Sequence, residues 1–325
     1  MKVAELLERR RRNWQQLESM CGRMRFGRLS MTPQEVARFA ALYRAACADL
    51  ALADAYQLPP STVQYLHGLV GRAHNRLYRT RSFDFARWGR LLLVDVPYRV
   101  VRDRCIQFVF CLFWGVFILS AVLAYLESVW PEYAEQMLGH SMIAQLEENF
   151  SRPLDGRNWE ENVMAASMYI RHNTGIGLQC FSGGLLIVPG LFITIFNSAY
   201  LGAAFGYMAR PDVAARPNFF EFVTAHGPFE LTAIALSAGA GLRLGVSWLA
   251  TGGLTRGSAL RKGGAEAMPM AGAAMVLFFL AAMIEGFLSP SPAPVAVKIA
   301  VAVASTVLLV LYFGVLGILG PGRAT

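Results

Sequence analysis

The stretch from residue 105 to residue 126, CIQFVFCLFWGVFILSAVLAYL, contains no Asp, Glu, Lys or Arg. As a helix rising about 1.5 Å per residue, it is long enough to cross the hydrocarbon core of a bilayer. The composition of the whole chain supports this interpretation, because only 16% of its 325 residues are charged and its mean hydropathy is +0.39. The sequence therefore predicts an all-α, polytopic helical membrane protein.

The charges on the two sides of this stretch have opposite sign. Residues 1–104 carry 19 Lys and Arg against 9 Asp and Glu, whereas residues 130–170 carry seven acidic and two basic residues. Positively charged flanks stay on the cytosolic side of a membrane. We therefore expect a protein of the cytoplasmic (inner) membrane, with region 1–104 in the cytosol and an acidic outer loop at 130–170.

A second uncharged stretch covers residues 172–209 and is too long for one span. As a single helix its 38 residues would measure about 57 Å, almost twice the thickness of the hydrocarbon core. Pro189-Gly190 lies near its middle and supplies a break. The stretch therefore predicts a tight hairpin of two spans, 163–188 and 191–209.

Three further apolar stretches bring the expected number of spans to about six. A six-span arrangement places the linker 251–267, with a net charge of +2, on the cytosolic side together with both termini. We assign the transmembrane domain to residues 105–320. The six expected spans are 105–126, 163–188, 191–209, 228–250, 268–288 and 296–319.

Region 1–104 has the pattern of a helical domain. Thr32-Pro33-Gln34-Glu35 predicts a helix start with a Thr cap and a capping box. We expect the next helix at Ser61, after Pro59-Pro60, and a membrane-surface helix rich in aromatic residues and Arg at 83–104. The predicted core faces consist of Val36, Phe39, Tyr43, Cys47 and Leu50 on one helix and Val63, Leu66, Val70, Ala73 and Leu77 on the next.

The positive charge of region 1–104 has two interpretations, nucleic-acid binding and attraction to anionic lipid. Because the charge lies next to a span, we favour membrane lipids as its partner and expect no nucleic acid. The five cysteines contain no CxxC pair of the kind that binds metals, and we interpret them as reduced, apolar residues. No phosphate-binding loop, nucleotide fingerprint or GxSxG motif occurs, so the sequence predicts neither an enzyme nor a cofactor.

His226-Gly227-Pro228-Phe229-Glu230 stands at the start of the fourth expected span. Residues four apart share one face of a helix, so His226 and Glu230 could form an acid–base pair or part of a metal site. Catalytic zinc sites have three protein ligands, and no second motif supplies the third. We therefore predict no metal site and no catalytic residue, and keep His226, Gly227 and Glu230 as a candidate functional motif.

Other polar residues and glycines lie inside the expected spans. Asn173 and Asn197 lie in the 172–209 hairpin, and Arg243 lies toward the inner end of the fourth span; we include these three residues in the candidate functional motif. Glu285 and Lys298 could pair across an outer turn. Small residues allow membrane helices to approach closely. The glycines predicted to pack helices together are Gly202, Gly206, Gly241 and Gly245.

Several short motifs occur in a fixed order along the chain. They are Leu42-Tyr43-Arg44, 58–66, 72–78, Asn197 through Gly202 and Gly206, His226-Gly227 with Glu230-Leu231, and Ala238-Gly239 through Leu244-Gly245. Together they resemble the stage II sporulation protein M family of bacterial and archaeal membrane proteins, over roughly residues 35–320. The resemblance implies a multi-pass protein of the cytoplasmic membrane, and the sporulation member looks like part of a complex with two wall-acting partners. The family brings no established catalytic residues.

Three functions follow as hypotheses. The first is a membrane scaffold that recruits or positions envelope partners for cell-wall remodelling, with protein partners in a membrane complex. We also allow for a homo-oligomer. The second is a transporter or channel for a solute through the polar 172–209 hairpin. The third is a metal-dependent membrane enzyme at His226 and Glu230.

Overall fold

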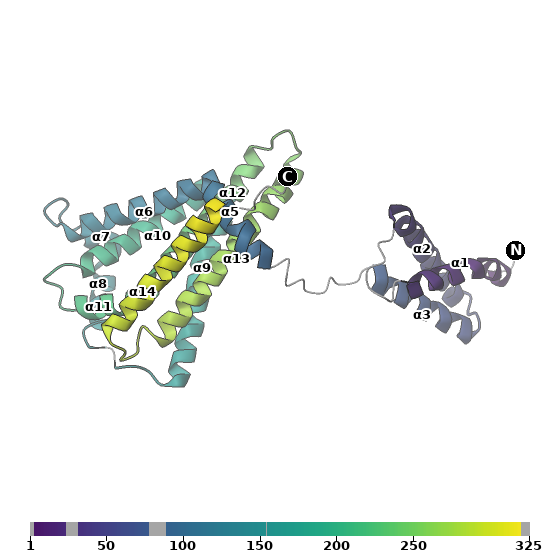
Figure 1. The fold of residues 1–325 in the computed structure, drawn as a ribbon, viewed down its shortest axis with the longest axis horizontal. Helices are drawn as coiled ribbons and strands as arrows, with labels where there is room; N and C mark the ends of the chain where they lie inside the picture. Colours follow the sequence, from purple (N-terminus) through teal and green to yellow (C-terminus); the bar gives the residue numbers. More distant parts are fainter. Residues whose placement is uncertain (1–2, 24–31, 78–88, 154, 320–325) are drawn as a thin grey trace. The chain divides into compact units, whose positions relative to one another are not determined.

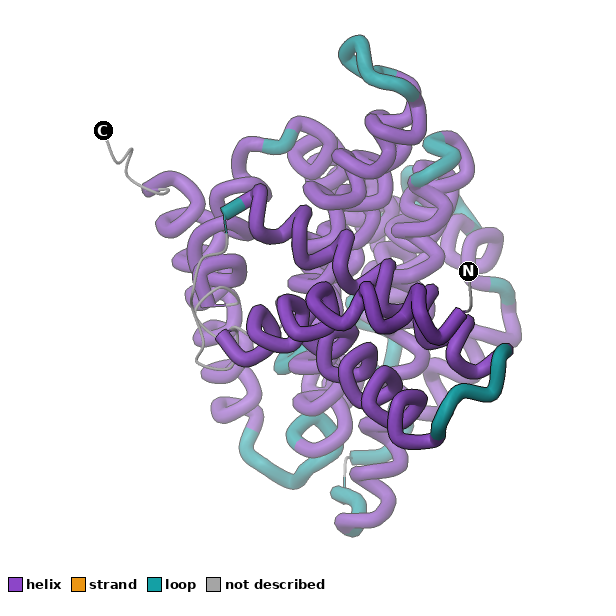
Figure 2. Tube along the Cα trace, turned by 90° about the vertical axis from the view of Figure 1, so that its right-hand side faces the viewer, coloured by secondary structure: helices purple, strands orange, loops and turns teal. Residues whose placement is uncertain are grey.

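The computed structural model describes residues 3–23, 32–77, 89–153 and 155–319. This part of the chain is built from helices and contains no strand (Figures 1 and 2). It divides into two compact units, an N-terminal unit from Met1 to Asp84 and a membrane unit from Phe85 to Thr325. The division falls earlier than the boundary at residue 104 expected from the charge pattern.

The N-terminal unit contains three helices, α1 (Val3–Arg23), α2 (Pro33–Ala55) and α3 (Pro60–Leu77). The predicted capping box at the start of α2 is confirmed, since the Glu35 N–H donates to Thr32 Oγ1 and the Thr32 N–H donates to the Glu35 carboxylate. Helix α3 begins at Pro60, one residue before the predicted start. Proline suits this first position because its missing N–H has no helical acceptor there.

The core of this unit differs from the predicted face of α2. Val36 is 45% exposed, and Phe39 is the one member of that face which is buried. Helix α2 packs against both α1 and α3, and small side chains let it approach them closely. The buried stripe therefore lies beside the predicted one, and Tyr43 and Leu50 pack at its edge. The residues that α2 buries are Phe39, Leu42, Ala46, Asp49 and Ala53.

Asp49 is the buried acid of this core. Its side chain is fully buried and accepts hydrogen bonds from Arg10 Nη1 at 2.5 Å and from Trp14 Nε1 at 2.8 Å. A buried carboxylate is tolerated only where such donors replace water. Asp49 thereby fixes α1 against α2, with the Trp14 ring buried beside it.

Replacing Asp49 with Ala should destabilise the N-terminal unit, because it leaves the Trp14 N–H buried and unpaired and removes the partner of Arg10. We expect a loss of about 2–4 kcal/mol. The measurement is urea denaturation of residues 1–84 followed by circular dichroism. Asp54→Ala is the control, since the half-exposed Asp54 carboxylate lies 3.7 Å from His67 in a surface ion pair, and should change stability by less than about 0.5 kcal/mol. Equal effects of the two variants would contradict this account of the core.

The membrane unit contains five helices among the described residues that are long and apolar enough to cross a membrane. They are α6 (Arg104–Tyr125), α10 (Val188–Met208), α12 (Gly227–Leu249), α13 (Arg256–Phe287) and the C-terminal helix Val295–Leu319, which joins α14 (Val295–Leu309), the π-helical turn η2 (Val310–Val315) and α15 (Leu316–Leu319). The chain is thus a polytopic helical membrane protein.

The sixth expected span corresponds to α9 (Trp159–Gly184), which packs against α10, α12 and α13. Polar residues, among them Arg171, His172, Asn173 and Gln179, lie along its middle. They lower its mean hydropathy, so α9 is not among the five helices that are apolar enough to cross a membrane. Its 26 residues are long enough to cross the hydrocarbon core, and its crossing remains a prediction.

The hairpin between α9 and α10 turns earlier than expected. The turn consists of Leu185, Leu186 and Ile187, and Ile187 has a φ of 59°. Pro189 lies in the first turn of α10. Proline begins a helix without loss of a backbone hydrogen bond, so the Pro189-Gly190 pair starts the second span instead of breaking the stretch.

Short helices complete the unit. In Figure 1, α7 (Tyr133–Leu138), α8 (His140–Asn149) and α11 (Arg216–Val223) gather near the end of the bundle where α14 begins. Helices α7 and α8 belong to the expected acidic loop. Their apolar residues form a small core with Ala124 of α6 and Ala203 of α10.

The described part of the expected surface helix 83–104 packs with the other helices of the membrane unit and belongs to it. The boundary between the two units therefore lies before this part of the chain and not after it. The described part forms the π-helical turn η1 (Leu91–Asp95) and α5 (Val96–Arg102); residues 83–88 lie outside the described residues. Val96 is fully buried, and Tyr312 of the C-terminal helix donates a hydrogen bond to the Leu92 carbonyl at 2.5 Å.

Glycines lie where helix backbones approach most closely. A Cβ atom at Gly202 or Gly206 of α10 would overlap the α6 backbone, and one at Gly241 or Gly245 of α12 would overlap the backbone of α9. Gly184 of α9 lies against Gly241 from the other side. These contacts are available only to residues without a side chain.

Two glycines of α9 give a matched test of this packing. A methyl group at Gly184 would lie within 3.0 Å of the Gly241 backbone, whereas one at Gly175 has no atom within 4 Å. Gly184→Ala should destabilise the detergent-solubilised protein by about 1–3 kcal/mol through overpacking. Gly175→Ala should leave stability unchanged or raise it by up to about 1 kcal/mol, since Ala favours the helix. Thermal denaturation of both variants checks this, and a stable Gly184→Ala protein would contradict the close crossing.

Candidate functional site

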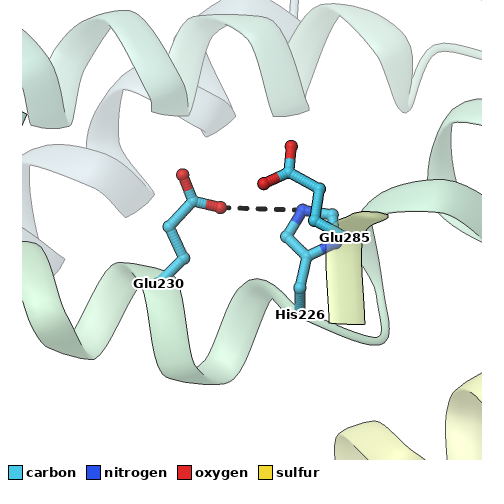
Figure 3. Close-up of side chains that lie close together, drawn as sticks. All are labelled: His226, Glu230 and Glu285. Carbon is cyan, nitrogen blue, oxygen red and sulfur yellow. Dashed lines mark ion pairs between the residues drawn. The ribbon is translucent and has the colours of Figure 1, made fainter. Parts of the chain in front are cut away.

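Polar side chains from two spans converge where α12 begins and α13 ends. His226 precedes the first residue of α12, Glu230 lies in its first turn, and Glu285 lies near the end of α13 (Figure 3). One ligand-type atom from each of the three residues lies within 4.8 Å of the others. We refer to these three residues as the polar cluster.

The start of α12 fixes the first two members. Gly227-Pro228 follows His226, and proline in the first turn begins the helix there. The four-residue spacing then places His226 and Glu230 on one face, with Nε2 of His226 3.6 Å from a Glu230 carboxylate oxygen. Only 5% of the His226 side chain and 20% of the Glu230 side chain are exposed.

The antiparallel packing of α12 and α13 brings Glu285 to the same place. Glu285 accepts a hydrogen bond from Asn173 Nδ2 of α9 at 3.3 Å, and both residues are buried. Arg157, exposed before α9, adds a positive charge that acts on Glu285. Three helices thus contribute to the surroundings of the polar cluster.

The predicted ion pair between Glu285 and Lys298 does not form. Lys298 Nζ instead donates to Glu221 Oε1 at 2.8 Å and to the Ser289 carbonyl at 3.0 Å. The reason is that Glu285 faces α9 and α12, whereas Lys298 in the first turn of α14 faces α11. Ser289 lies in the turn between α13 and α14, and its hydroxyl is 2.9 Å from His226 Nδ1.

The remaining members of the predicted motif lie elsewhere. Asn197 donates to the Ile193 carbonyl of its own helix at 2.8 Å. Arg243 lies toward the other end of α12, where it forms ion pairs with Asp103 and Glu266. Thirteen residues separate Arg243 from Glu230, which is about 20 Å along a helix. Of the three, only Asn173 lies at the same site as His226, Gly227 and Glu230, where it donates a hydrogen bond to Glu285.

The sequence did not assign Glu285, Ser289 and Glu221 to this site. An acid within an apolar stretch was the available signal for Glu285, but its separation from His226 along the chain concealed the contact. Ser289 and Glu221 carried no signal, because one lies in a turn and the other in a short helix outside the expected spans.

The polar cluster offers one imidazole and two carboxylates in a buried environment. Such a set can accept protons or bind a divalent cation. We see no Ser or Cys nucleophile in it: the Ser289 hydroxyl contacts the imidazole nitrogen Nδ1, which faces away from the carboxylates.

A mostly apolar groove runs beside α12. Its volume is about 790 Å³, and it lies between the α5–α6 corner, α12 and the C-terminal helix. Gly227 and Gly314 lie at its wall, and a Cβ atom on Gly227 would meet no atom within 4 Å. Residues that line the groove include Phe110, Trp114, Phe220, Leu231, Thr232 and Phe313.

Comparison with known proteins connects this architecture to a family. Residues 106–290, more than half of the chain, match the family model described as Stage II sporulation protein M. Residues 4–79 match a domain of unknown function (DUF8413). No curated protein and no solved structure matches the chain.

Lys298 gives a test of the contacts around the site. Lys298→Met should destabilise the protein by about 1–3 kcal/mol, since it leaves the Ser289 carbonyl and the Glu221 carboxylate without their shared donor. Thermal denaturation in detergent measures the change. The same substitution at Lys262, which is exposed on α13, is the control and should have almost no effect. Restored stability in a Lys298→Met, Glu221→Leu double variant would show that the unpaired acid causes the loss.

Proposed function

We propose that this chain, which belongs to the stage II sporulation protein M family, is a membrane scaffold that recruits or positions cell-wall-remodelling partners in the envelope. We place it in the cytoplasmic membrane with both termini in the cytosol, because the basic region precedes the first span and the acidic region follows it. We further propose that it acts by binding proteins and not as an enzyme.

The groove beside α12 is the observation that carries this proposal. Its lining is mostly apolar, so a partner that enters it must also be apolar. Transmembrane helices associate through small residues that let backbones approach, and Gly227 has open space where a side chain would lie. The groove therefore suits the transmembrane helix of a partner protein.

The N-terminal unit supports the same proposal. It has its own hydrophobic core around Leu17, Leu42 and Leu66, separate from the cores of the membrane unit. A separately packed domain can bind a second partner without altering the membrane helices. Its basic charge would also hold it close to anionic lipids.

The hydrogen bonds of the hairpin favour a scaffold over a transporter. Thr194 donates to the Gly190 carbonyl, Asn197 to Ile193 and Ser198 to Phe113 of α6. The Ser198 bond holds α10 against α6, and the Thr194 and Asn197 bonds lie within α10. All three donors are therefore occupied by backbone carbonyls and do not line a path for a solute. We therefore do not propose transport through this hairpin.

Site-specific crosslinking tests the groove. A photoreactive phenylalanine analogue at Thr232, which lines the groove, should crosslink to an envelope protein in native membranes. The control is the same residue at Leu119, a position on α6 that is 58% exposed and lies outside the groove lining. Leu119 should yield lipid adducts only, because it faces the bilayer.

Two results would count against the proposal. Lipid adducts alone from Thr232 would show that acyl chains fill the groove. The same protein adducts from both positions would show contact without a specific site. Loss of the Thr232 adduct when Gly227→Leu narrows the groove would instead localise the partner to it.

A further inference from the structure

The polar cluster brings together three side chains that can bind a metal ion. Two ligands at about 2.1 Å from a tetrahedral zinc ion lie about 3.4 Å apart, and His226 Nε2 and the Glu230 oxygen are 3.6 Å apart. One ligand-type atom from each of the three residues lies within 4.8 Å of the others, so a side-chain shift of about 1 Å would bring all three to one ion. Figure 3 shows both carboxylates beside the imidazole ring.

The imidazole is oriented for this role. Ser289, fully buried, holds Nδ1 of His226 at 2.9 Å, and this leaves Nε2 facing the two carboxylates. Metal-binding histidines usually have a hydrogen-bond partner on the nitrogen that does not bind the ion. The 3.6 Å separation from Glu230 is too long for a hydrogen bond. Nε2 of a residue that is 96% buried is thus aimed into the cluster without a hydrogen bond to it.

The composition of the cluster also suits a cation. Two carboxyl groups lie together with an imidazole, and a buried carboxylate is costly unless a cation or a proton compensates its charge. Among the described residues, neither Glu230 nor Glu285 forms an ion pair with Lys or Arg. Lys298 Nζ donates its hydrogen bonds to Glu221 and to the Ser289 carbonyl. Arg157 is exposed, so water screens its positive charge.

We propose that His226, Glu230 and Glu285 bind one divalent transition-metal ion of the zinc type. The imidazole decides the class, because Mg²⁺ and Ca²⁺ prefer oxygen ligands whereas zinc binds imidazole and carboxylate together. The sequence pattern displays only His226 and Glu230 as ligands, and so it predicted no metal site. Glu285, 55 residues further along the chain from Glu230, provides the third. This proposal does not rest on the scaffold function.

The test is zinc binding by the purified full-length chain in detergent. After removal of metals with a chelator, the protein is dialysed against buffered Zn²⁺, and bound zinc is measured by mass spectrometry. We expect about one zinc per chain. His226→Ala, Glu230→Gln and Glu285→Gln should each weaken binding by at least about tenfold, since each removes one of three ligands.

Matched controls separate the site from nonspecific binding. His140→Ala and Glu148→Gln replace exposed residues of the same types on α8, and both should bind zinc like the unaltered protein. Ser289→Ala keeps all three ligands and removes only the hydrogen bond to His226, so binding should weaken by about tenfold. This variant remains informative if the ligand substitutions impair folding.

Substitution with Co²⁺ gives a second readout that does not depend on affinity. Visible absorption typical of a low-symmetry nitrogen–oxygen site should appear in the unaltered protein and be lost in Glu285→Gln. Absence of zinc from the chelator-treated and reloaded protein would overturn the proposal and leave protons as the compensating charge. Equal zinc binding by the His226→Ala, Glu285→Gln and unaltered proteins would overturn it as well.

Discussion

Close approach between helix backbones is the constraint on which the membrane unit depends. Lipid tails are as apolar as the side chains that face them, so helices in a bilayer associate through packing and hydrogen bonds instead of escape from water. Here α12 lies against α9 through Gly184, Gly241 and Gly245, and α10 lies against α6 through Gly202 and Gly206. The hydroxyls of Ser120, Ser198 and Ser237 then reach carbonyls on the neighbouring helix.

The same packing creates the polar cluster. Because α12 and α13 run antiparallel in close register, residues near the start of one face residues near the end of the other. One end of this pair holds His226, Glu230 and Glu285, and the other end holds Arg243 with Glu266. The ionisable groups of the pair therefore lie toward its ends, and its middle is apolar.

Patterns that are local in the chain were predictable, and contacts between distant elements were not. The Thr32 cap needs only Glu35 three residues later, and an uncharged stretch such as 105–126 suffices for a span. By contrast, Leu185–Ile187 turns the hairpin because Pro189 is better placed at a helix start than at a break. Glu285 was visible as an ionisable residue, but its partners are set by the register of α9, α12 and α13, which hydropathy does not encode.

The contact between α5 and the C-terminal helix joins the two ends of the membrane unit. Gly317 lies against Pro97 and Val101, and Tyr312 bonds to Leu92. The segment before the first span is thus held against the last helix. A pulling force on the N-terminal unit would reach the C-terminal helix through this contact before it reached α6. The first and last helices of the bundle would therefore bear the force together.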